Sequence, residues 1–181
     1  MARKTDQPDI RERLLAGAAE VLSSDGIEGL TVRRVVEAAG RSTMCVYTKF
    51  GSRGGLMNAV YQQAADGLFA VLERSRPVEG SATLGLAAAY RRFALANPGA
   101  YALLFDHSLP ALDIDESVRS DTITRVVGLL TDGGGALETW ATMHDLIALE
   151  RSLPWSATGL PSGDWKSFYL QTLRSALVAP A

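Results

Sequence analysis

Apolar residues recur at intervals of three and four along most of the chain, and short polar or glycine-rich breaks separate the runs. This spacing predicts amphipathic helices. The first run extends over residues 10–22. Asp9 precedes this run and Glu12 follows three residues later, which is the spacing of a capping box. Asp25-Gly26 is a typical helix end. We therefore expect one helix between Asp9 and Asp25.

Three further helices are expected in the next fifty residues. Thr31 is placed to cap a short helix that Gly40 closes, and a second short helix is predicted over about Thr43–Lys49. Ser52 is placed to cap a long helix that extends to about Arg74. The apolar positions on one face of this long helix are Leu56, Val60, Ala64, Leu68 and Leu72.

Beyond Pro77 the pattern stays helical and becomes more apolar. Helices are predicted over residues 82–95, 99–105, 116–131, 136–152 and 164–178. Asn97-Pro98-Gly99 and residues 132–135 separate some of them, and residues 107–115 are expected to form a loop. Because no strand-like alternation occurs, the predicted fold class is all-α.

Composition narrows the class of protein further. The chain has 181 residues, 47% of them apolar and 21% charged, which suits a folded protein with a real core. The single cysteine, Cys45, excludes an intramolecular disulfide and fits a reducing compartment. No apolar run approaches the length of a membrane span, and no signal peptide is recognised, so a cytoplasmic location is expected.

Charge is distributed unevenly along the chain. The net charge is −2, yet residues 1–53 carry nine basic and seven acidic side chains and the remainder carries nine and thirteen. The asymmetry is modest. It indicates that a nucleic-acid surface, if there is one, lies in the N-terminal third.

The segment from Thr31 to Phe50 has the pattern of a helix-turn-helix. Its first helix would bury valines, Gly40 would allow a tight turn, and Val46 and Phe50 would hold the second helix to the core. The opposite face of that second helix suits base edges and phosphates in a major groove. This face carries Ser42, Thr43, Met44, Tyr47, Thr48 and Lys49. From these residues alone, an ordinary helical hairpin with a polar exterior remains an alternative.

The same residues resemble the DNA-binding signature of TetR/AcrR-type regulators. The resemblance rests on Thr31, the Ala38-Ala39-Gly40 turn, Tyr47 and Phe50-Gly51-Ser52-Arg53, with Leu56 closing it. It covers about residues 10–60. It implies a three-helix DNA-binding domain over residues 1–53 and a helical-bundle domain for ligand binding and dimerisation over residues 54–181.

The resemblance also implies roles for individual residues. Thr43 and Met44 fall where the recognition helix of the family touches bases. Thr31, Tyr47 and Lys49 fall where backbone phosphates are contacted. Arg53 replaces the usual lysine at the start of the fourth helix, where a helix N-terminus and a cation together suit a phosphate.

Three positions depart from the family pattern. Arg41 stands where a small apolar residue is usual, and either a phosphate contact or a solvated arginine would explain it. Gly54-Gly55 replaces a common acidic pair, which predicts a soft start to the fourth helix because glycine costs helix stability. Cys45 lies on the recognition helix, where burial is expected rather than a redox role.

Aromatic residues of the later helices are candidates for the lining of an apolar cavity, with ordinary core packing as the alternative. The candidate pocket comprises Phe69, Tyr90, Phe93, Tyr101, Phe105, Trp140, Met143 and His144. Residues 89–105 and 140–150 resemble a TetR subgroup with a Trp–His–Gly helix, although Asp145 replaces the glycine. A satisfied core or interface histidine is the alternative for His144.

The family precedent places the last two long helices in a dimeric four-helix interface. Here these are residues 136–152 and 164–178. The apolar positions expected to supply it are Leu137, Met143, Ile147, Leu170, Leu173 and Leu177. Two recognition helices about one DNA turn apart would then read a palindromic operator.

Three functions remain open on the sequence. The leading hypothesis is a homodimeric repressor released by a small apolar or amphipathic ligand. A DNA-binding protein without a ligand is the second, and a helical enzyme or metal carrier is the third. For the third, only the acidic loop of Asp113, Asp115 and Glu116 offers ligands, and a solvated loop explains it better. We expect no enzyme activity, no metal and no cofactor.

Overall fold

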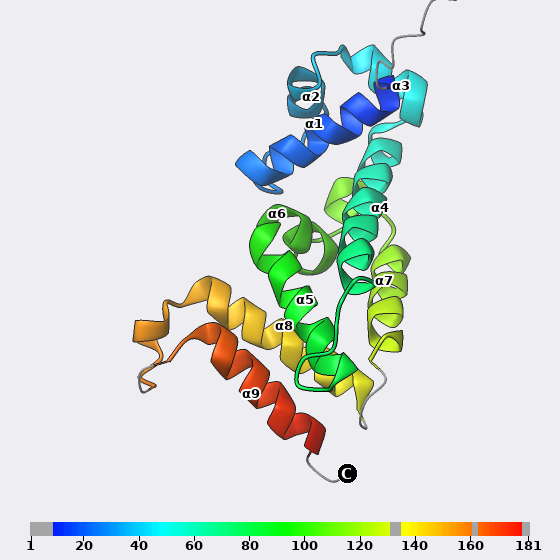
Figure 1. Ribbon diagram of the computed structural model, residues 1–181. Coiled ribbons are helices and arrows are strands. Elements are labelled where there is room, and N and C mark those ends of the chain that lie inside the picture. Colours follow the sequence, from blue (N-terminus) through cyan, green and yellow to red (C-terminus); the bar gives the residue numbers. More distant parts are fainter. Residues whose placement is uncertain (1–8, 131–134, 161–162, 179–181) are drawn as a thin grey trace, which may run out of the picture. The chain divides into compact units, whose positions relative to one another are not determined.

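The computed structural model describes residues 9–130, 135–160 and 163–178, and helices are the main secondary structure of these residues (Figure 1). Outside the helices, they contain a single isolated antiparallel bridge, between Val78 and Ser81. The α-helices are α1 (Ile10–Ser24), α2 (Val32–Ala38), α3 (Thr43–Phe50), α4 (Arg53–Leu72), α5 (Ala82–Ala96), α6 (Pro98–Tyr101), α7 (Ser117–Gly128), α8 (Ala136–Ser152) and α9 (Trp165–Val178). The all-α prediction is confirmed.

The described residues divide into two compact units. The first unit combines the chain up to Asp66 with Asn97–Val118, and the second combines Gly67–Ala96 with the chain from Arg119 onward. The packing boundary therefore lies within α4. The functional boundary after Arg53 that the sequence suggests stays a prediction.

Local sequence signals account for the first helices. The Glu12 carboxylate accepts a hydrogen bond from the backbone N–H of Asp9 at 3.2 Å, as the capping-box spacing predicts. The Thr31 hydroxyl accepts from the backbone N–H of Arg34 at 3.3 Å and so caps α2. Gly40 has a φ of +61° directly after α2, a conformation that favours glycine and allows the turn into α3.

Each of the four leading helices of the first unit contributes at least one fully buried side chain to its core. Leu14, Val35, Val46 and Leu56 each have 0% exposure. α6 adds a close backbone contact, since a Cβ at Gly99 would lie 2.1 Å from the carbonyl oxygen of Leu22 at the end of α1. Only glycine fits there, so α6 packs directly on α1.

Two segments after α5 differ from the sequence prediction. The short aromatic helix expected over residues 99–105 begins one residue earlier and widens into a π-helical turn, η1 (Ala102–Asp106). The expected loop over residues 107–115 contains a 3₁₀ turn, η2 (Pro110–Leu112). α7 stops at Gly128, and the predicted end of that helix at Thr131 lies outside the described residues.

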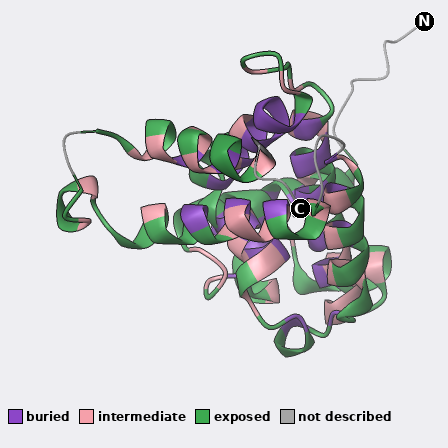
Figure 2. Ribbon diagram, turned by 90° about the horizontal axis from the view of Figure 1, so that it is seen from below, coloured by how far each residue is buried: buried purple, intermediate pink, exposed green. Residues whose placement is uncertain are grey.

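The core of the second unit lies among α5, α8 and α9. The buried hydroxyl of Tyr169 donates to the carbonyl of Ala87 at 3.1 Å, which joins α9 to α5. The half-buried Arg91 donates through Nε to the Glu150 carboxylate at 2.6 Å, which joins α5 to α8. Figure 2 shows buried and exposed positions alternating along individual helices, as amphipathic packing requires.

Candidate nucleic-acid interface

α3 is held to the first unit along one side and open on the other. Val46 is fully buried, and Phe50 is half-buried with the guanidinium of Arg11 5.4 Å from its ring centre. On the outward side, Met44 is 69% exposed and Tyr47 is 54% exposed. Because they are three residues apart on one helix, these two side chains are neighbours and form an exposed pair that a partner can cover. The remaining residues predicted for this face, Ser42, Thr43, Thr48 and Lys49, are exposed as well.

Arg41, in the connection between α2 and α3, and Cys45, within α3, differ from this open face. Arg41 is half-buried, and its Nε atom is buried without a hydrogen-bond partner among the described residues. This partial burial counts against a fully solvated arginine, and the phosphate contact of Arg41 stays a prediction. Cys45 is half-buried, with its Sγ 3.7 Å from the Ser42 hydroxyl.

The cations predicted to contact phosphates are both engaged by carboxylates. The Lys49 ammonium lies 3.2 Å from Oδ1 of Asp9, and this contact is the main cause that lowers the pKa of the Asp9 carboxyl. The Arg53 guanidinium lies 2.5 Å from Oδ2 of Asp113. Because these groups are all substantially exposed, the pairs hold the side chains only weakly.

The glycine pair at the start of α4 has a packing role that the sequence did not reveal. A Cβ at Gly55 would lie 2.0 Å from the carbonyl oxygen of Phe50, and one at Gly54 would lie 2.9 Å from that of Asp113. Ser52 still caps the helix, since its hydroxyl accepts from the backbone N–H of Gly55 at 3.0 Å. The pair therefore permits close approach of two backbone segments to the first turn of α4.

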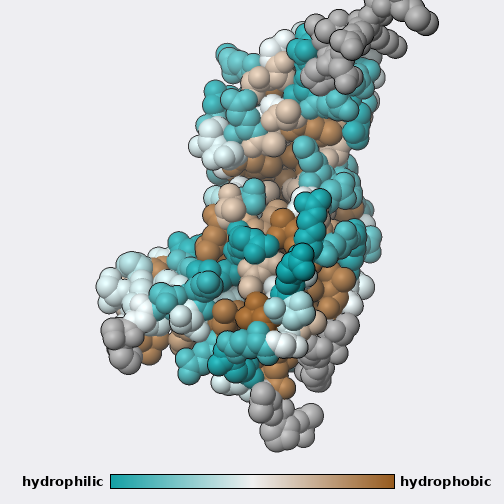
Figure 3. All heavy atoms as spheres, in the orientation of Figure 1, coloured by the Kyte–Doolittle hydropathy of each residue, from teal (hydrophilic) through white to brown (hydrophobic). Residues whose placement is uncertain are grey.

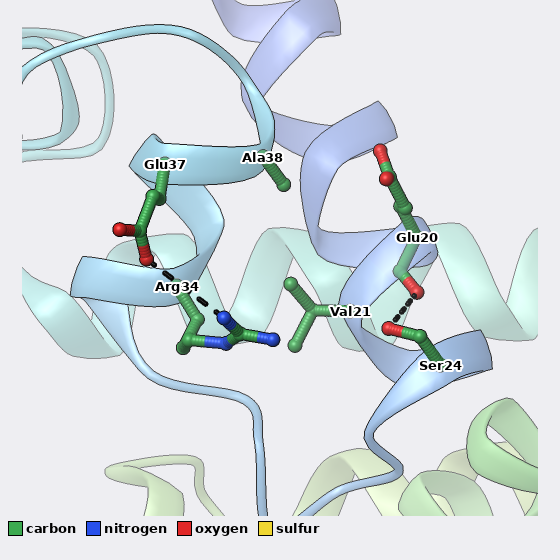
Figure 4. Close-up of a pocket in the computed structure, with 6 residues that line it drawn as sticks. All are labelled: Glu20, Val21, Ser24, Arg34, Glu37 and Ala38. Atoms are coloured by element: carbon green, nitrogen blue, oxygen red, sulfur yellow. Dashed lines mark hydrogen bonds and ion pairs between the residues drawn. The ribbon is translucent and has the colours of Figure 1, made fainter.

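A surface pocket of about 240 Å³ lies between α1 and α2, and it is lined by residues of these two helices (Figure 4). Arg34 dominates it electrostatically. This side chain contacts the carboxylates of Asp25 and Glu37, and the contact with Arg34 is the main cause that lowers the pKa of Asp25. The sequence did not predict this pocket, whose cation is already balanced by acidic side chains.

The residues predicted to line a ligand pocket fall into both units. Tyr101 and Phe105 lie in the first unit with ring centres 5.1 Å apart, and the others lie in the second. Within the second unit, Trp140 and His144 are half-buried and stacked, with ring centres 5.5 Å apart. The fully or nearly fully buried members of that unit are Phe69, Tyr90, Phe93 and Met143.

Three side chains expected at a dimer interface are instead packed inside the second unit. Met143, Ile147 and Leu173 each have 0% exposure, because they are directed toward the protomer's own core. The helical period identified the apolar stripe but not which apolar positions remain outside. Hydrophobic side chains also reach the surface of the protein (Figure 3), and in the second unit the exposed ones include Leu137, Leu149, Leu153 and Leu160.

The acidic loop that offered the best metal ligands has structural partners. Asp113 pairs with Arg53, Asp115 accepts from the backbone N–H of Ser117, and Glu116 accepts from that of Leu109. In the described part of the chain, no group of three potential metal-binding side chains comes together. No helix in the described ranges combines the length and hydropathy that a membrane crossing requires.

The two halves of the chain both match known protein families. Residues 14–60 match the family of bacterial regulatory proteins of the tetR type, and residues 83–161 match a tetracyclin repressor-like C-terminal domain. The first match covers all of α2 and α3.

Curated relatives and solved structures agree with these matches. The chain is 26% identical over 151 residues to the uncharacterized HTH-type transcriptional regulator Rv0681 of Mycobacterium tuberculosis, an alignment covering 77% of this chain and 69% of the relative. It is 29% identical over 121 residues to the HTH-type transcriptional repressor AcnR of Corynebacterium glutamicum, covering 66% of this chain and 57% of AcnR.

The fold is shared with a protein of unknown function from Rhodococcus sp. RHA1, at a TM-score of 0.71 and 24% identity over 98% of this chain and 100% of that one. It is also shared with the multidrug binding protein EbrR, at a TM-score of 0.68 and 23% identity over 97% of this chain and 98% of EbrR.

An outward-facing α3, set after the tight turn at Gly40, places the chain in the class of helix-turn-helix DNA-binding proteins. With both domain matches, the chain belongs to the TetR family of bacterial regulatory proteins. This family and the curated relatives are transcriptional regulators rather than enzymes.

Proposed function

We propose that the protein is a homodimeric repressor that binds a palindromic DNA operator through α3 and leaves it when a small ligand binds. The observation that carries the DNA-binding part is the open face of α3. Met44 and Tyr47 extend from a helix whose opposite side is fixed by the fully buried Val46. A rigid helix with an uncovered face suits insertion into a major groove.

The residues of this face divide into two tasks. Thr43 and Met44, near the start of α3, would contact base edges and set sequence preference. Tyr47, Lys49 and Arg53 would contact the phosphate backbone, which sets affinity and its dependence on salt. The remaining proposed DNA contacts are Thr31, Arg41, Ser42 and Thr48. Under this division residues 1–53 read DNA and the rest of the chain controls that reading.

Dimerisation is proposed through the outer faces of α8 and α9. The exposed leucines on or just after α8 (Leu137, Leu149 and Leu153) are apolar area that a second copy would cover. Trp155, in the connection between α8 and α9, forms an edge-to-face aromatic cluster with Trp165 and Phe168 of α9. Two α3 helices set about 34–36 Å apart would then match successive turns of DNA.

Ligand control is proposed for the second unit. The stacked Trp140 and His144 offer an aromatic face beside a polar ring, which suits an apolar or amphipathic small molecule. The likeness to EbrR, whose solved structures contain imidazole and malachite green, supports this choice. A ligand would act only by binding more tightly to the state that does not fit the operator. Repression is proposed because the relative AcnR is named a repressor.

The decisive experiment presents the purified protein with a pool of duplexes of random sequence. Recovery of a common palindrome supports the proposal, and failure to enrich any sequence contradicts it. The same duplex then tests ligand control in a screen of small apolar molecules. If the second unit binds none of them and the operator affinity never changes, a DNA-binding protein without a ligand is the better description.

A further inference from the structure

The turn that follows η1 holds one residue in an unusual backbone conformation. Asp113 has φ +59° and ψ +34°, the left-handed region that side-chain-bearing residues seldom adopt. Such a conformation persists only where the surroundings support it, although aspartate adopts it more readily than most residues. It fixes the direction in which the Asp113 side chain leaves the turn.

The surroundings of Asp113 do enforce this conformation. Leu112 and Ile114, its two neighbours, are 5% and 3% exposed, so the chain is fixed on both sides. The backbone N–H of Asp113 donates to the carbonyl of Pro110 at 3.1 Å, and that of Ile114 donates to the carbonyl of Leu109 at 3.1 Å. The turn is therefore closed by its own hydrogen bonds, and it presents an exposed carboxylate from a fixed backbone.

That carboxylate meets the first residue of α4. Arg53 donates through Nη1 to Oδ2 of Asp113 and through Nη2 to the carbonyl oxygen of Ala111, at 3.2 Å. Both terminal nitrogens of the guanidinium are thus engaged by one turn. Gly54 completes the contact, because a Cβ there would lie 2.9 Å from the carbonyl oxygen of Asp113. The sequence predicted that Arg53 contacts a DNA phosphate, and no pattern in it linked Arg53 to Asp113, sixty positions later.

We propose that Asp113 is a positioning residue that competes with the DNA phosphate for Arg53 and so sets the affinity of the protein for DNA. The Asp113 carboxylate and the Ala111 carbonyl together occupy the two terminal nitrogens of Arg53 that a phosphate would otherwise contact, so Arg53 cannot make both sets of hydrogen bonds at once. DNA binding then requires Arg53 to leave the turn. This inference rests on the proposed DNA-binding function.

The neighbouring carboxylates do not share this role. Asp115 accepts from the backbone N–H of Ser117 at 2.8 Å, and the hydrogen bonds from Ser117 are what lower the pKa of its carboxyl. Glu116 accepts from the backbone N–H of Leu109 at 3.3 Å. Asp115 thus carries the same charge two residues away with a different partner. Replacing Asp115 therefore serves as a matched control, because it removes the same negative charge from the loop, and so the same general repulsion of DNA, without affecting Arg53.

The test compares Asp113→Asn with Asp115→Asn in the full-length protein. Asparagine tolerates the left-handed conformation, so the first substitution removes the charge and keeps the turn. Affinity is measured by fluorescence anisotropy at low salt on two duplexes, one selected by the wild-type protein from a random pool and one of unselected sequence. Arg53→Gln and the double variant Arg53→Gln/Asp113→Asn complete a double-mutant cycle.

The inference predicts that Asp113→Asn tightens binding to both duplexes by about two- to five-fold over Asp115→Asn, the range expected for an exposed ion pair. It also predicts that the gain disappears when Arg53 is already replaced. Equal affinities of the two asparagine variants, or a gain that persists with Arg53→Gln, would overturn it. Absence of DNA binding by the wild-type protein would instead overturn the proposed function itself.

Discussion

A Cβ atom added at Gly55 would lie 2.0 Å from the carbonyl oxygen of Phe50, so the end of α3 and the first turn of α4 touch through their backbones. Intrinsic helix propensity favours alanine over glycine by about 1 kcal/mol in a helix. At Gly55 the clash with a backbone atom outweighs this preference, so alanine is expected to destabilise the protein. Gly55→Ala is expected to lower the free energy of unfolding by about 1–3 kcal/mol, measured by urea denaturation.

The matched control lies in the same helix. A Cβ at the exposed Gly67 would meet only the ring of Phe93, at an ordinary contact distance of 3.8 Å. Gly67→Ala should therefore raise the free energy of unfolding by about 0.5–1 kcal/mol. If both substitutions stabilise the protein, the glycine pair marks a soft helix start, as the sequence alone suggested, and not a close contact.

Replacement of Tyr47 by alanine should separate DNA binding from folding. The side chain is 54% exposed, so its loss should change the free energy of unfolding by no more than about 0.5 kcal/mol. Operator binding, followed by gel shift, should be lost. Val46→Ala provides the contrast, since that neighbouring side chain is fully buried and its truncation should destabilise the fold. Loss of structure in Tyr47→Ala would mean that this face packs against the protein.

Acid should destabilise the first unit through its ion-paired aspartates. The pKa of Asp25 lies below its ordinary value of 3.8, first because of the hydrogen bond from Arg34 and then that from Ser24. A lowered pKa in the folded state adds stability above the unfolded pKa, and this stability is lost as pH falls through the folded pKa. The free energy of unfolding, measured by urea denaturation, should therefore stay level down to about pH 5 and fall at lower pH, and Asp25→Asn should make this fall less steep. If the free energy of unfolding depends on pH in Asp25→Asn as it does in the wild-type protein, the pair of Asp25 with Arg34 contributes nothing to the loss of stability in acid.

The dimer interface can be tested at an exposed leucine of α8. Leu149 is 46% exposed, so Leu149→Glu should leave the protomer folded while placing a charge in the proposed interface. Sedimentation should then show a monomer where the wild-type protein is a dimer. Leu95→Glu is the control, because Leu95 is 39% exposed at the end of α5 and lies outside the proposed interface. If both variants remain dimeric, the interface lies elsewhere.

The sequence predicted best the features that depend on near neighbours. The bounds of α1 and α2 follow from Asp9, Asp25 and Thr31, each of which acts on the backbone within a few residues. The direction of α3 follows from Val46, since one buried side chain on a short helix leaves the opposite face outside.

Contacts between distant segments could not be predicted from spacing. The pair of Arg53 with Asp113 depends on how α4 meets the turn after η1, and no local pattern encodes that approach. The widening of the helix after Tyr101 into a π-helical turn was missed for the same reason. Helical period placed Met143 on an apolar stripe, but only the packing of α8 inside its unit decides that it is fully buried.

The measurement that tests the central claim most directly is selection of bound DNA from a random duplex pool, followed by repetition with Thr43 and Met44 substituted. The account predicts a palindrome with half-sites about one helical turn apart, and a changed preferred sequence in the Thr43 and Met44 variants. It predicts weaker binding without changed preference when Lys49 is replaced, because a phosphate contact carries no sequence information. Recovery of no common sequence, or the same sequence after both substitutions on α3, would contradict it.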